Sequence, residues 1–572
     1  MRSSLFLISS LCTTYFSSTT KLKRYALCCI LLFMLPAMLF SKDIVVKTES
    51  NKMVEITLTA SGDYKDPFNE VELDAIFTEP SGKQLKVPAF WDGGKVWKIR
   101  YASPLEGTHS FTTACSKNED NGLNNVKGKV EIKKYKGSNP LLQRGAVRIA
   151  DDKRHFAYGD GTPFFWMGDT WWMGLTKRLV WPDDVKKLAD DRIKKGFNVV
   201  QIVAGLYPDM PAFDPRGENE AGFPWEADYA GIRPAYFDAA DKKIMYLAEQ
   251  GITPCIVGAW GYHLPWLGVD KMKQHWRYLI ARWGALPVVW CAAGEITMPF
   301  YLSQTKDADR EWLKTEWTNV IRYMKETDPF KRTVTAHPSR TARESLTDPA
   351  LLDFDMHQSG HGSGPAKQSA LALEGWRTQP VMPVMSGESR YEALAIPKPL
   401  PAEAPRGAFW AHTVNSGLAG HTYGANGIWQ LNGIDKPYGN SPGGNNWGIT
   451  PWNEAMQLPG STQIGAARKL IESIPGWNSF QPQPEMITQW SAKDTAVLAV
   501  TAGNQSALAY LPSPGTITIT LPVSDQQYKA CWFNPITVIR EKEFAITTDA
   551  SGKFAATSPE TKQDWVLVLT KN

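Results

Sequence analysis

The sequence predicts a central (β/α)8 barrel flanked by an N-terminal Ig-like β-sandwich and a C-terminal antiparallel β-sandwich. Residues 42–136 and 476–572 alternate apolar and polar side chains with the period of two that is typical of half-buried strands. Between them, residues 137–475 alternate apolar strand-like runs with amphipathic helical stretches, the order expected of a parallel barrel. The length of 572 residues also favours several domains over a single hydrophobic core.

A basic segment followed by an apolar run stands near the start of the chain. Lys21–Arg24 precedes Tyr25–Phe40, and about 16 apolar residues are short for a membrane span but suit a secretory signal. Residues 1–41 are therefore predicted to be a signal peptide with an upstream extension. We expect a periplasmic or extracellular protein with no stable membrane span after cleavage. A lipid-anchoring cysteine is disfavoured, because Cys28 and Cys29 lie inside the apolar run.

The composition indicates an ordinary globular protein that does not bind nucleic acid. A formal net charge of +4 gives no electrostatic case for nucleic acid or for an anionic membrane. The 23 tryptophans suggest flat apolar surfaces for sugar rings, although most tryptophans simply pack in cores. Neither a disulfide framework nor a zinc site is indicated by the spacing of the cysteines beyond the signal, Cys115, Cys255, Cys291 and Cys531. No cofactor is expected.

The two flanking β-domains are predicted from short alternating segments separated by turn signals such as Asp92-Gly-Gly94. In the N-terminal domain these segments are Val54–Thr59, Val71–Phe77 and Val96–Tyr101. In the C-terminal domain they are Thr495–Val500, Ala507–Tyr510, Thr516–Leu521, Tyr528–Phe533 and Trp565–Leu569. The N-terminal domain has no cluster of carboxylates and aromatic residues that suggests catalysis, so we expect it to serve packing or ligand presentation.

The barrel prediction depends on eight apolar segments. The first strand, Phe164–Asp169, has a polar exit, and Trp181-Pro182 then opens a helix with acidic residues in its first turn. The other strands are predicted at Asn198–Val203, Ile252–Val257, Val288–Ala293, Thr333–Ala336, Asp353–Met356, Val381–Met385 and Gly427–Trp429. Among the helices are Asp238–Gln250, Asp270–Trp283 and Asp307–Glu326. A doubly wound open sheet is the alternative, but it would require a glycine-rich phosphate loop where the sequence has Gly168–Trp172.

Two carboxylates follow predicted barrel strands. Glu295 comes after the fourth strand, and Glu388 comes after the seventh. The C-terminal ends of barrel strands hold the reactive groups of such enzymes, and two carboxyl groups there are the minimal set for cleaving a glycosidic bond. A surface acid at a strand end is the competing interpretation for either residue alone.

The two acids need different ionisation states. Glu295 follows an apolar strand, which would desolvate it and raise its pKa, so we expect it to be the acid/base. Glu388, with Arg390 nearby in sequence, is the expected nucleophile, and Glu392 is its main rival. In a retaining enzyme the two carboxyl groups lie about 5 Å apart, whereas about 6.5–9.5 Å would indicate inversion.

Polar and aromatic residues near the other strand exits are candidates for sugar binding. They are Asp169, Trp171, Trp172, Trp260, His263, His337, His357, His361, Tyr391, Glu392, His421, Tyr423 and Trp429. Several histidines beside carboxylates suit hydrogen bonding to sugar hydroxyls. A three-histidine metal site is the alternative, but no pair of histidines has the spacing of a helix-borne metal site.

Motifs along most of the chain resemble those of the apiosidase-like glycoside hydrolases of family 140 and of the DUF4038 barrel proteins. Phe164–Trp172 is similar to their first-strand signature, and Ser386–Glu392 to the seventh-strand motif that carries the nucleophile. Trp91–Arg100 with Glu106–His109 resembles a DUF5060-type β-sandwich. Two segments, Ala509–Pro512 and Cys531–Pro535, resemble a C-terminal module named for proposed collagen binding.

Two positions depart from the pattern of that family. Glu295 stands where the family pattern has aspartate, and Ser389 stands where proline is usual. The resemblance implies a glycoside hydrolase, but apiose as substrate does not follow, because loops determine which sugar is bound. We therefore expect a secreted retaining hydrolase of a plant or microbial oligo- or polysaccharide. The alternatives are a non-catalytic carbohydrate-binding or cell-surface protein and a histidine-ligated metal-dependent hydrolase.

Overall fold

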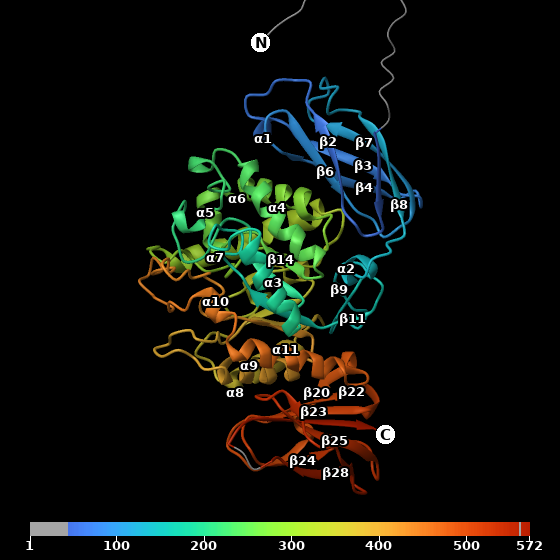
Figure 1. Cartoon of the computed structure of the whole chain (residues 1–572), viewed down its shortest axis with the longest axis vertical. Coiled ribbons are helices and arrows are strands. Elements are labelled where there is room, and N and C mark those ends of the chain that lie inside the picture. The colour runs from blue at the N-terminus through green and yellow to red at the C-terminus, as the bar shows by residue number, and fades with distance from the viewer. Residues whose placement is uncertain (1–43, 560–561, 572) are drawn as a thin grey trace, which may run out of the picture. The chain divides into compact units, whose positions relative to one another are not determined.

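The computed structural model describes residues 44–559 and 562–571 (Figure 1). The predicted signal peptide lies outside these residues. Within them, an eight-stranded barrel stands in the chain between two β-domains, which confirms the predicted fold class.

Two sheets form the N-terminal β-sandwich, with strand orders β1-β8-β7-β3-β4 and β2-β6-β5. Phe77 on β3 stacks on Tyr101 on β6, with ring centroids 3.9 Å apart, so the core lies between the sheets. The elements are β1 (Ile44–Glu49), β2 (Val54–Thr59), α1 (Pro67–Glu70), β3 (Leu73–Thr78), β4 (Gln84–Pro88), β5 (Phe90–Trp91), β6 (Val96–Tyr101), β7 (Gly107–Cys115) and β8 (Lys127–Lys133).

Eight parallel strands form the barrel, in the order β16-β15-β14-β13-β12-β19-β18-β17. The first and eighth strands pair directly, and Asp353 N–H donates to Val334 O between the fifth and sixth, so the sheet is nearly closed. The strands are β12 (Trp166–Thr170), β13 (Val199–Val203), β14 (Thr253–Val257), β15 (Val289–Cys291), β16 (Val334–Thr335), β17 (Asp355–Gln358), β18 (Val384–Glu388) and β19 (Gly420–Tyr423).

Helices α3, α4, α6 and α7 lie around the barrel strands (Figure 1). Helix α3 ends where Gly196 takes a left-handed backbone, with φ of 102°. The helices of this region are α2 (Pro140–Gln143), α3 (Asp183–Lys195), α4 (Pro234–Glu249), α5 (Leu264–Leu267), α6 (Val269–Trp283), α7 (Lys306–Thr327), α8 (Pro365–Arg377), α9 (Glu403–Asn415), α10 (Trp452–Ala455) and α11 (Pro459–Glu472). A small sheet of β9 (Arg148–Ile149), β10 (Phe156–Ala157) and β11 (Pro163–Phe164) precedes the first barrel strand.

The predicted position of the eighth strand is wrong. The strand is Gly420–Tyr423, whereas the predicted segment Gly427–Trp429 lies in a turn. Gly427 has φ of 91°, and a Cβ there would lie 2.4 Å from Thr450 O, so this glycine serves the turn. The prediction failed because the true strand is polar and its apolar signal is weak.

The C-terminal β-domain consists of two sheets, β20-β22-β23-β29-β25-β26 with β27 on β25, and β21-β24-β28. It packs on α9, in which every residue from Ala404 to Asn415 is buried. Arg406 on this helix makes two 2.9 Å hydrogen bonds to Asp564, so the domain is bonded to the barrel region. The strands are β20 (Phe480–Pro482), β21 (Ile487–Trp490), β22 (Val497–Thr501), β23 (Ser506–Leu511), β24 (Thr516–Thr520), β25 (Gln527–Asn534), β26 (Ile539–Arg540), β27 (Phe544–Thr547), β28 (Lys553–Thr557) and β29 (Trp565–Lys571).

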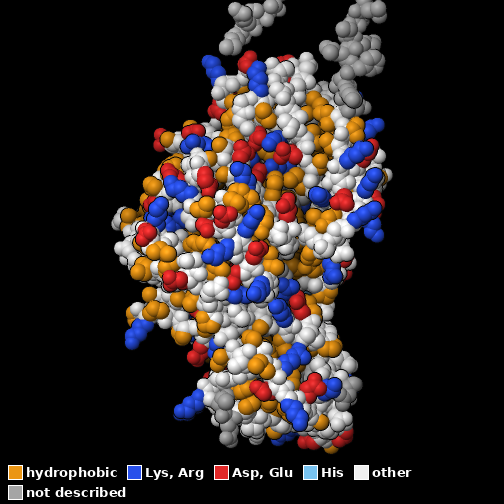
Figure 2. All heavy atoms as spheres, in the orientation of Figure 1, with side chains coloured by type: hydrophobic (Ala, Val, Ile, Leu, Met, Phe, Trp, Pro, Cys, Tyr) orange, Lys and Arg blue, Asp and Glu red, His pale blue; other side chains and the backbone are white. Residues whose placement is uncertain are grey.

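Charged side chains of both signs are interspersed over the face that Figure 2 shows, in keeping with the small net charge. None of the helices within residues 44–559 and 562–571 is long and apolar enough to cross a membrane.

Candidate active site

A cavity of about 140 Å³ lies where the fourth and seventh barrel strands end. Glu295 and Glu388 both line it, so the two carboxylates predicted at separate strand ends are brought together. The other lining residues are Trp172, Pro208, Asp209, Trp260, Tyr301, Gln358, His361, Tyr391, Leu394, Trp429 and Trp447. Four tryptophans and three acids, Glu295, Glu388 and Asp209, therefore surround one small space.

Gln358 links the two carboxylates directly. Its Nε2 donates to Glu295 Oε1 at 2.9 Å and to Glu388 Oε1 at 3.0 Å. Because both bonds start from one nitrogen, the two oxygens lie no farther apart than the bond lengths together, at most about 5.9 Å. The side-chain oxygen of Gln358 is buried without a hydrogen-bond partner among the described residues.

Three side chains besides Gln358 contact the carboxylate of Glu388. Tyr391 donates its hydroxyl to Oε2 at 2.8 Å, His337 Nε2 lies 3.3 Å from Oε2, and His361 Nε2 lies 3.2 Å from Oε1. His361 Nδ1 lies 2.7 Å from Ser389 O and must donate to this carbonyl. A neutral imidazole has one N–H, so its Nε2 would then direct a lone pair at the negative carboxylate, which is repulsive. The contacts therefore favour the charged imidazolium form of His361.

These contacts separate the pKa values of the two acids. Burial alone would raise the pKa of Glu388, but the contacts that His337 and His361 make with its carboxylate outweigh burial and hold this pKa well below its usual range. Burial, followed by the negative charge of Glu388, raises the pKa of Glu295 to about 7. Burial also opposes the charged form of His361, but the contact with Glu388 outweighs it and raises the pKa of His361. Below about pH 7, Glu388 is therefore ionised while Glu295 is mostly protonated.

A left-handed backbone holds Glu295 at the cavity. Its φ is 38°, which costs a non-glycine residue about 1–3 kcal/mol. The ring of Trp260 packs against the preceding residue, Gly294, where an added Cβ would lie 2.1 Å from a ring carbon. The N–H of Glu295 points to His337 Nδ1 at 3.4 Å, so this backbone connects the fourth strand end to the fifth.

Several predicted site residues point out of the barrel, because side chains on a strand alternate between its two faces. Asp169 accepts from Arg192 on α3 at 2.6 Å and from Trp171 at 2.7 Å. His357 lies 3.2 Å from His412 on α9, and His421 contacts Phe409 on the same helix. None of Asp169, His357 or His421 lines the cavity.

The remaining candidates divide between the cavity and the surrounding structure. Trp172, Trp260, Tyr391 and Trp429 line the cavity, and His337 contacts both catalytic candidates. Tyr423 donates to Glu392 at 2.5 Å, and Glu392 also accepts from Gly460 N–H, so the rival carboxylate is engaged outside the cavity. His263 bonds to Tyr207 O at 2.9 Å, and burial lowers its pKa to about 4. Residues 44–559 and 562–571 contain no group of three or more His, Cys, Asp or Glu residues that could hold a metal ion.

Besides the apolar Pro208 and Leu394, four residues with polar or aromatic side chains line the cavity without having been predicted: Gln358, Asp209, Tyr301 and Trp447. Gln358 directly follows the predicted His357, and only the strand's alternation distinguishes which of the two faces inward. The other three lie on long loops after β13, β15 and β19. The sequence did contain one signal for Asp209. The end of the second strand was the one strand end without a candidate residue, and an aspartate follows it.

Asp209 ties these three loops together. Tyr301 donates its hydroxyl to Oδ1, and Trp447 Nε1 donates to Oδ2 at 3.0 Å. Burial raises the pKa of Asp209, and the charge of Glu388 adds to this, while the two hydrogen bonds oppose it. The carboxylate of Asp209 is buried at the cavity wall and both of its oxygens accept hydrogen bonds, so it holds Tyr301 and Trp447 in position there.

Replacement of Asp209 by alanine should lower kcat/KM by about tenfold to hundredfold, because small displacements of positioning groups have effects of this size. The change leaves a tyrosine hydroxyl and an indole N–H without acceptors. Steady-state kinetics and a thermal melt measure the outcome. Trp447→Phe, which removes one of the two bonds and keeps a ring, should show a smaller loss. An Asp209→Ala variant with unchanged kcat/KM would contradict the positioning role.

Family models and solved structures match the chain over nearly all its described length. Residues 150–478 match the model "Apiosidase-like, catalytic domain", which covers more than half of the chain. Residues 47–116 match the domain of unknown function DUF5060, and residues 481–570 match a domain proposed to bind collagen in a collagenase. No curated protein sequence matches the chain.

Three solved structures share the fold at low sequence identity. A candidate glycoside hydrolase from Bacteroides vulgatus is 17% identical, with 92% of this chain and 100% of that chain covered and a TM-score of 0.68. A family 5 glycoside hydrolase from the same species is 20% identical, with 77% and 95% covered and a TM-score of 0.63. A third structure, titled glycoside hydrolase, is 21% identical, with 76% and 99% covered and a TM-score of 0.61.

Proposed function

Because this chain belongs to the apiosidase-like family and is a glycoside hydrolase, we propose that it cleaves its substrate with retention of configuration. In this proposal Glu295 is the acid/base and Glu388 the nucleophile. The observation that carries it is the pair of hydrogen bonds from Gln358, which limits the two carboxylate oxygens to at most about 5.9 Å. Retaining enzymes have carboxyl groups about 5–5.5 Å apart, and inverting enzymes need about 6.5–9.5 Å to admit water.

The reaction proceeds in two steps. Glu388 attacks the anomeric carbon as a carboxylate, while Glu295 gives its proton to the glycosidic oxygen, which leaves as an alcohol. The product is a glycosyl ester on Glu388. In the second step Glu295, now a carboxylate, takes a proton from water, whose oxygen attacks the anomeric carbon and releases Glu388.

The electrostatics of the cavity support the change of role at Glu295. Its raised pKa owes its second largest contribution to the negative charge of Glu388. Formation of the ester removes that charge, so the pKa of Glu295 falls and the residue becomes a base for the second step. Tyr391, His337 and His361 stabilise the charge of Glu388 before attack and when it is released.

The pH dependence follows from the two pKa directions. The active form has Glu388 ionised and Glu295 protonated, so kcat/KM should fall tenfold per pH unit above a pKa of about 7. On the acid side, the decline should occur below the usual glutamate range, because the pKa of Glu388 is lowered. A profile of kcat/KM against pH measures both limbs. An alkaline limb near pH 4–5, where an unperturbed glutamate titrates, would contradict the acid role of Glu295.

The walls of the cavity support a saccharide substrate. Trp172, Trp260, Trp429 and Trp447 present aromatic surface around the two acids, and aromatic rings suit the C–H faces of sugars. We further propose that the substrate is a plant or microbial oligo- or polysaccharide and that the chain is exported. The proposal of export depends on the basic and apolar segments near the N-terminus.

A glycan hydrolysis screen followed by proton NMR tests the proposal. The screen identifies a cleaved glycan, and NMR observes the anomer released first. We expect the configuration of the cleaved bond to be preserved. First release of the opposite anomer would overturn retention and make Glu388 a general base.

A further inference from the structure

A second cavity, larger than the catalytic one, lies where the N-terminal sandwich meets helix α6. Its volume is about 280 Å³, and we call it the seam pocket. Its aromatic lining residues are Phe68, Phe90, Trp91, Trp97 and Tyr278, and its polar ones are Asn69, Glu70, Glu72, Ser116, Gln274 and Arg277. We propose that the seam pocket binds a neutral saccharide unit of the substrate polymer, which rests on the proposed function of the barrel.

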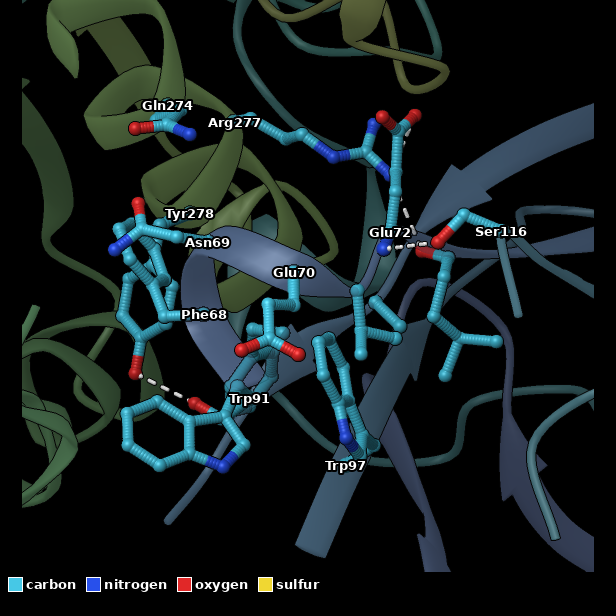
Figure 3. A pocket seen from close by; sticks show the side chains of 14 residues that line it. Phe68, Asn69, Glu70, Glu72, Trp91, Trp97, Ser116, Gln274, Arg277 and Tyr278 are labelled. Atoms are coloured by element: carbon cyan, nitrogen blue, oxygen red, sulfur yellow. Dashed lines mark hydrogen bonds and ion pairs between the residues drawn. The ribbon is translucent and has the colours of Figure 1, made fainter. Parts of the chain in front are cut away.

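Two tryptophans line the pocket, Trp91, which is partly buried, and Trp97, which is buried. Trp91 on β5 and Trp97 on β6 are direct partners in an antiparallel pair, so their side chains lie on one face of the sheet. Figure 3 shows both indoles on one side of the view and Gln274 and Arg277 of α6 on the other, with Glu70 between them. This combination of aromatic surface and a few polar groups is typical of small-molecule sites.

Hydrogen bonds across the seam fix both walls. Tyr278 donates its hydroxyl to Trp91 O at 3.0 Å, and Arg277 donates to Asp74 at 2.7 Å and to Leu73 O at 3.1 Å. The buried guanidinium of Arg100 on β6 also bonds to Asp241 on α4. The pocket is therefore formed before a ligand arrives, which lowers the entropic cost of binding.

Polar groups on the lining remain available to a ligand. Within residues 44–559 and 562–571, the amide of Gln274 has no hydrogen-bond or ionic partner, and it lies on the face of α6 that lines the pocket. In the part of the chain that the structure describes, Glu70 engages only Oε1, which accepts from Asp66 N–H at 3.1 Å. An amide and a carboxylate oxygen provide donors and acceptors for sugar hydroxyls.

The charges of the pocket favour a neutral ligand over an acidic one. Glu70 and Glu72 contribute negative charge, and the single lining cation, Arg277, is already paired with Asp74 and lies 3.5 Å from Glu72. No unpaired cation among the lining residues could compensate a uronic acid or a phosphate. A neutral pyranose or furanose ring stacked on Trp91 meets these constraints, and Trp91 is only partly buried.

Affinity electrophoresis of the full chain carrying Glu388→Gln tests this site. The gels contain a neutral polysaccharide (galactan, arabinan or xyloglucan) or polygalacturonate as the acidic comparison. We expect at least one neutral polysaccharide to retard the protein, and Trp91→Ala to weaken that binding at least tenfold. Trp312→Ala, which removes an exposed tryptophan on α7, is the matched control and should leave binding unchanged.

Gln274→Ala provides a second variant at a partly buried position on α6, so the test does not depend on the folding of Trp91→Ala. It should weaken binding severalfold at an unchanged melting temperature. In the active chain, Trp91→Ala should lower kcat/KM on the polymer and leave turnover of a short glycoside unchanged. No retardation by any neutral polysaccharide, equal binding of the Trp91 and Trp312 variants, or tightest binding to polygalacturonate would each overturn the site.

The outcomes separate this site from the proposed function. If the chain hydrolyses a glycan with retention but Trp91→Ala changes nothing, the seam pocket fails alone. If Trp91→Ala weakens polysaccharide binding but the parent chain cleaves with inversion, the retaining mechanism fails alone.

Discussion

Substitution of Glu388 by glutamine is expected to lower kcat by at least about 10⁴-fold, because removal of a catalytic nucleophile eliminates the covalent route. The amide is nearly isosteric with the carboxylate, but it cannot attack the anomeric carbon. It also removes the negative charge that Tyr391, His337 and His361 surround. Steady-state kinetics on the glycan found by screening measures the loss, and a thermal melt shows that the fold persists.

Glu392→Gln is the matched control for this prediction. It lies four residues further along and is also buried, but it bonds to Tyr423 and Gly460 N–H, outside the cavity. We expect kcat in this variant to stay within about tenfold of the parent. Glu392 does not line the cavity, so its replacement can affect the reaction only by displacing the residues that do. If Glu392→Gln abolished activity while Glu388→Gln retained it, Glu392 would be the nucleophile instead of Glu388.

A further test of Glu388 uses its alanine variant. The space left by the side chain admits a small anion such as azide, which can attack an activated aryl glycoside from the same side. We expect azide to restore turnover and to give a glycosyl azide of inverted configuration. Rescue with retained configuration would place the nucleophile elsewhere.

Substitution of Glu295 by glutamine is expected to lower kcat/KM by about 10²–10⁴-fold on a glycan, the range for loss of a general acid. The loss should depend on the leaving group. An alkoxide needs a proton in order to leave, whereas an activated phenolate does not, so aryl glycosides should retain much of the first step. The alkaline limb near pH 7 should also disappear, because its titrating group is gone.

Two results would contradict the role of Glu295. One is an equal loss for glycans and for activated aryl glycosides, and the other is an alkaline limb that persists in the glutamine variant. Glu295→Asp is an informative companion, because it shortens the side chain by one methylene and separates it from Gln358. We expect its activity to lie between the parent and Glu295→Gln, with the acid function retained but displaced.

The sequence predicted the fold class and the two acids because both depend on local patterns. Apolar runs separated by amphipathic stretches define parallel strands and their crossover helices. A carboxylate directly after such a run, as at Glu295 and Glu388, must lie at the end of the barrel where the strands terminate. The eighth strand was not predicted, because Gly420–Tyr423 consists of glycine, histidine, threonine and tyrosine and contains no apolar run.

The environment of the acids could not be predicted in the same way. His357 and Gln358 are adjacent in sequence, but one points to α9 and the other bridges the two carboxylates. A shift of one residue in the strand register would turn His357 toward the cavity and Gln358 toward α9. The pattern of apolar residues does not determine the register where the strand is polar.

The sequence by itself determined the alternation of strands and helices through the first seven strands and hence which end of the barrel holds Glu295 and Glu388. Only the tertiary structure decided which neighbours face them, because that depends on strand register and on loops distant in sequence. Asp209, Tyr301 and Trp447 meet at the cavity from three separate loops. The opposite pKa shifts of the two acids likewise come from burial and from contacts that exist only when the strands are assembled.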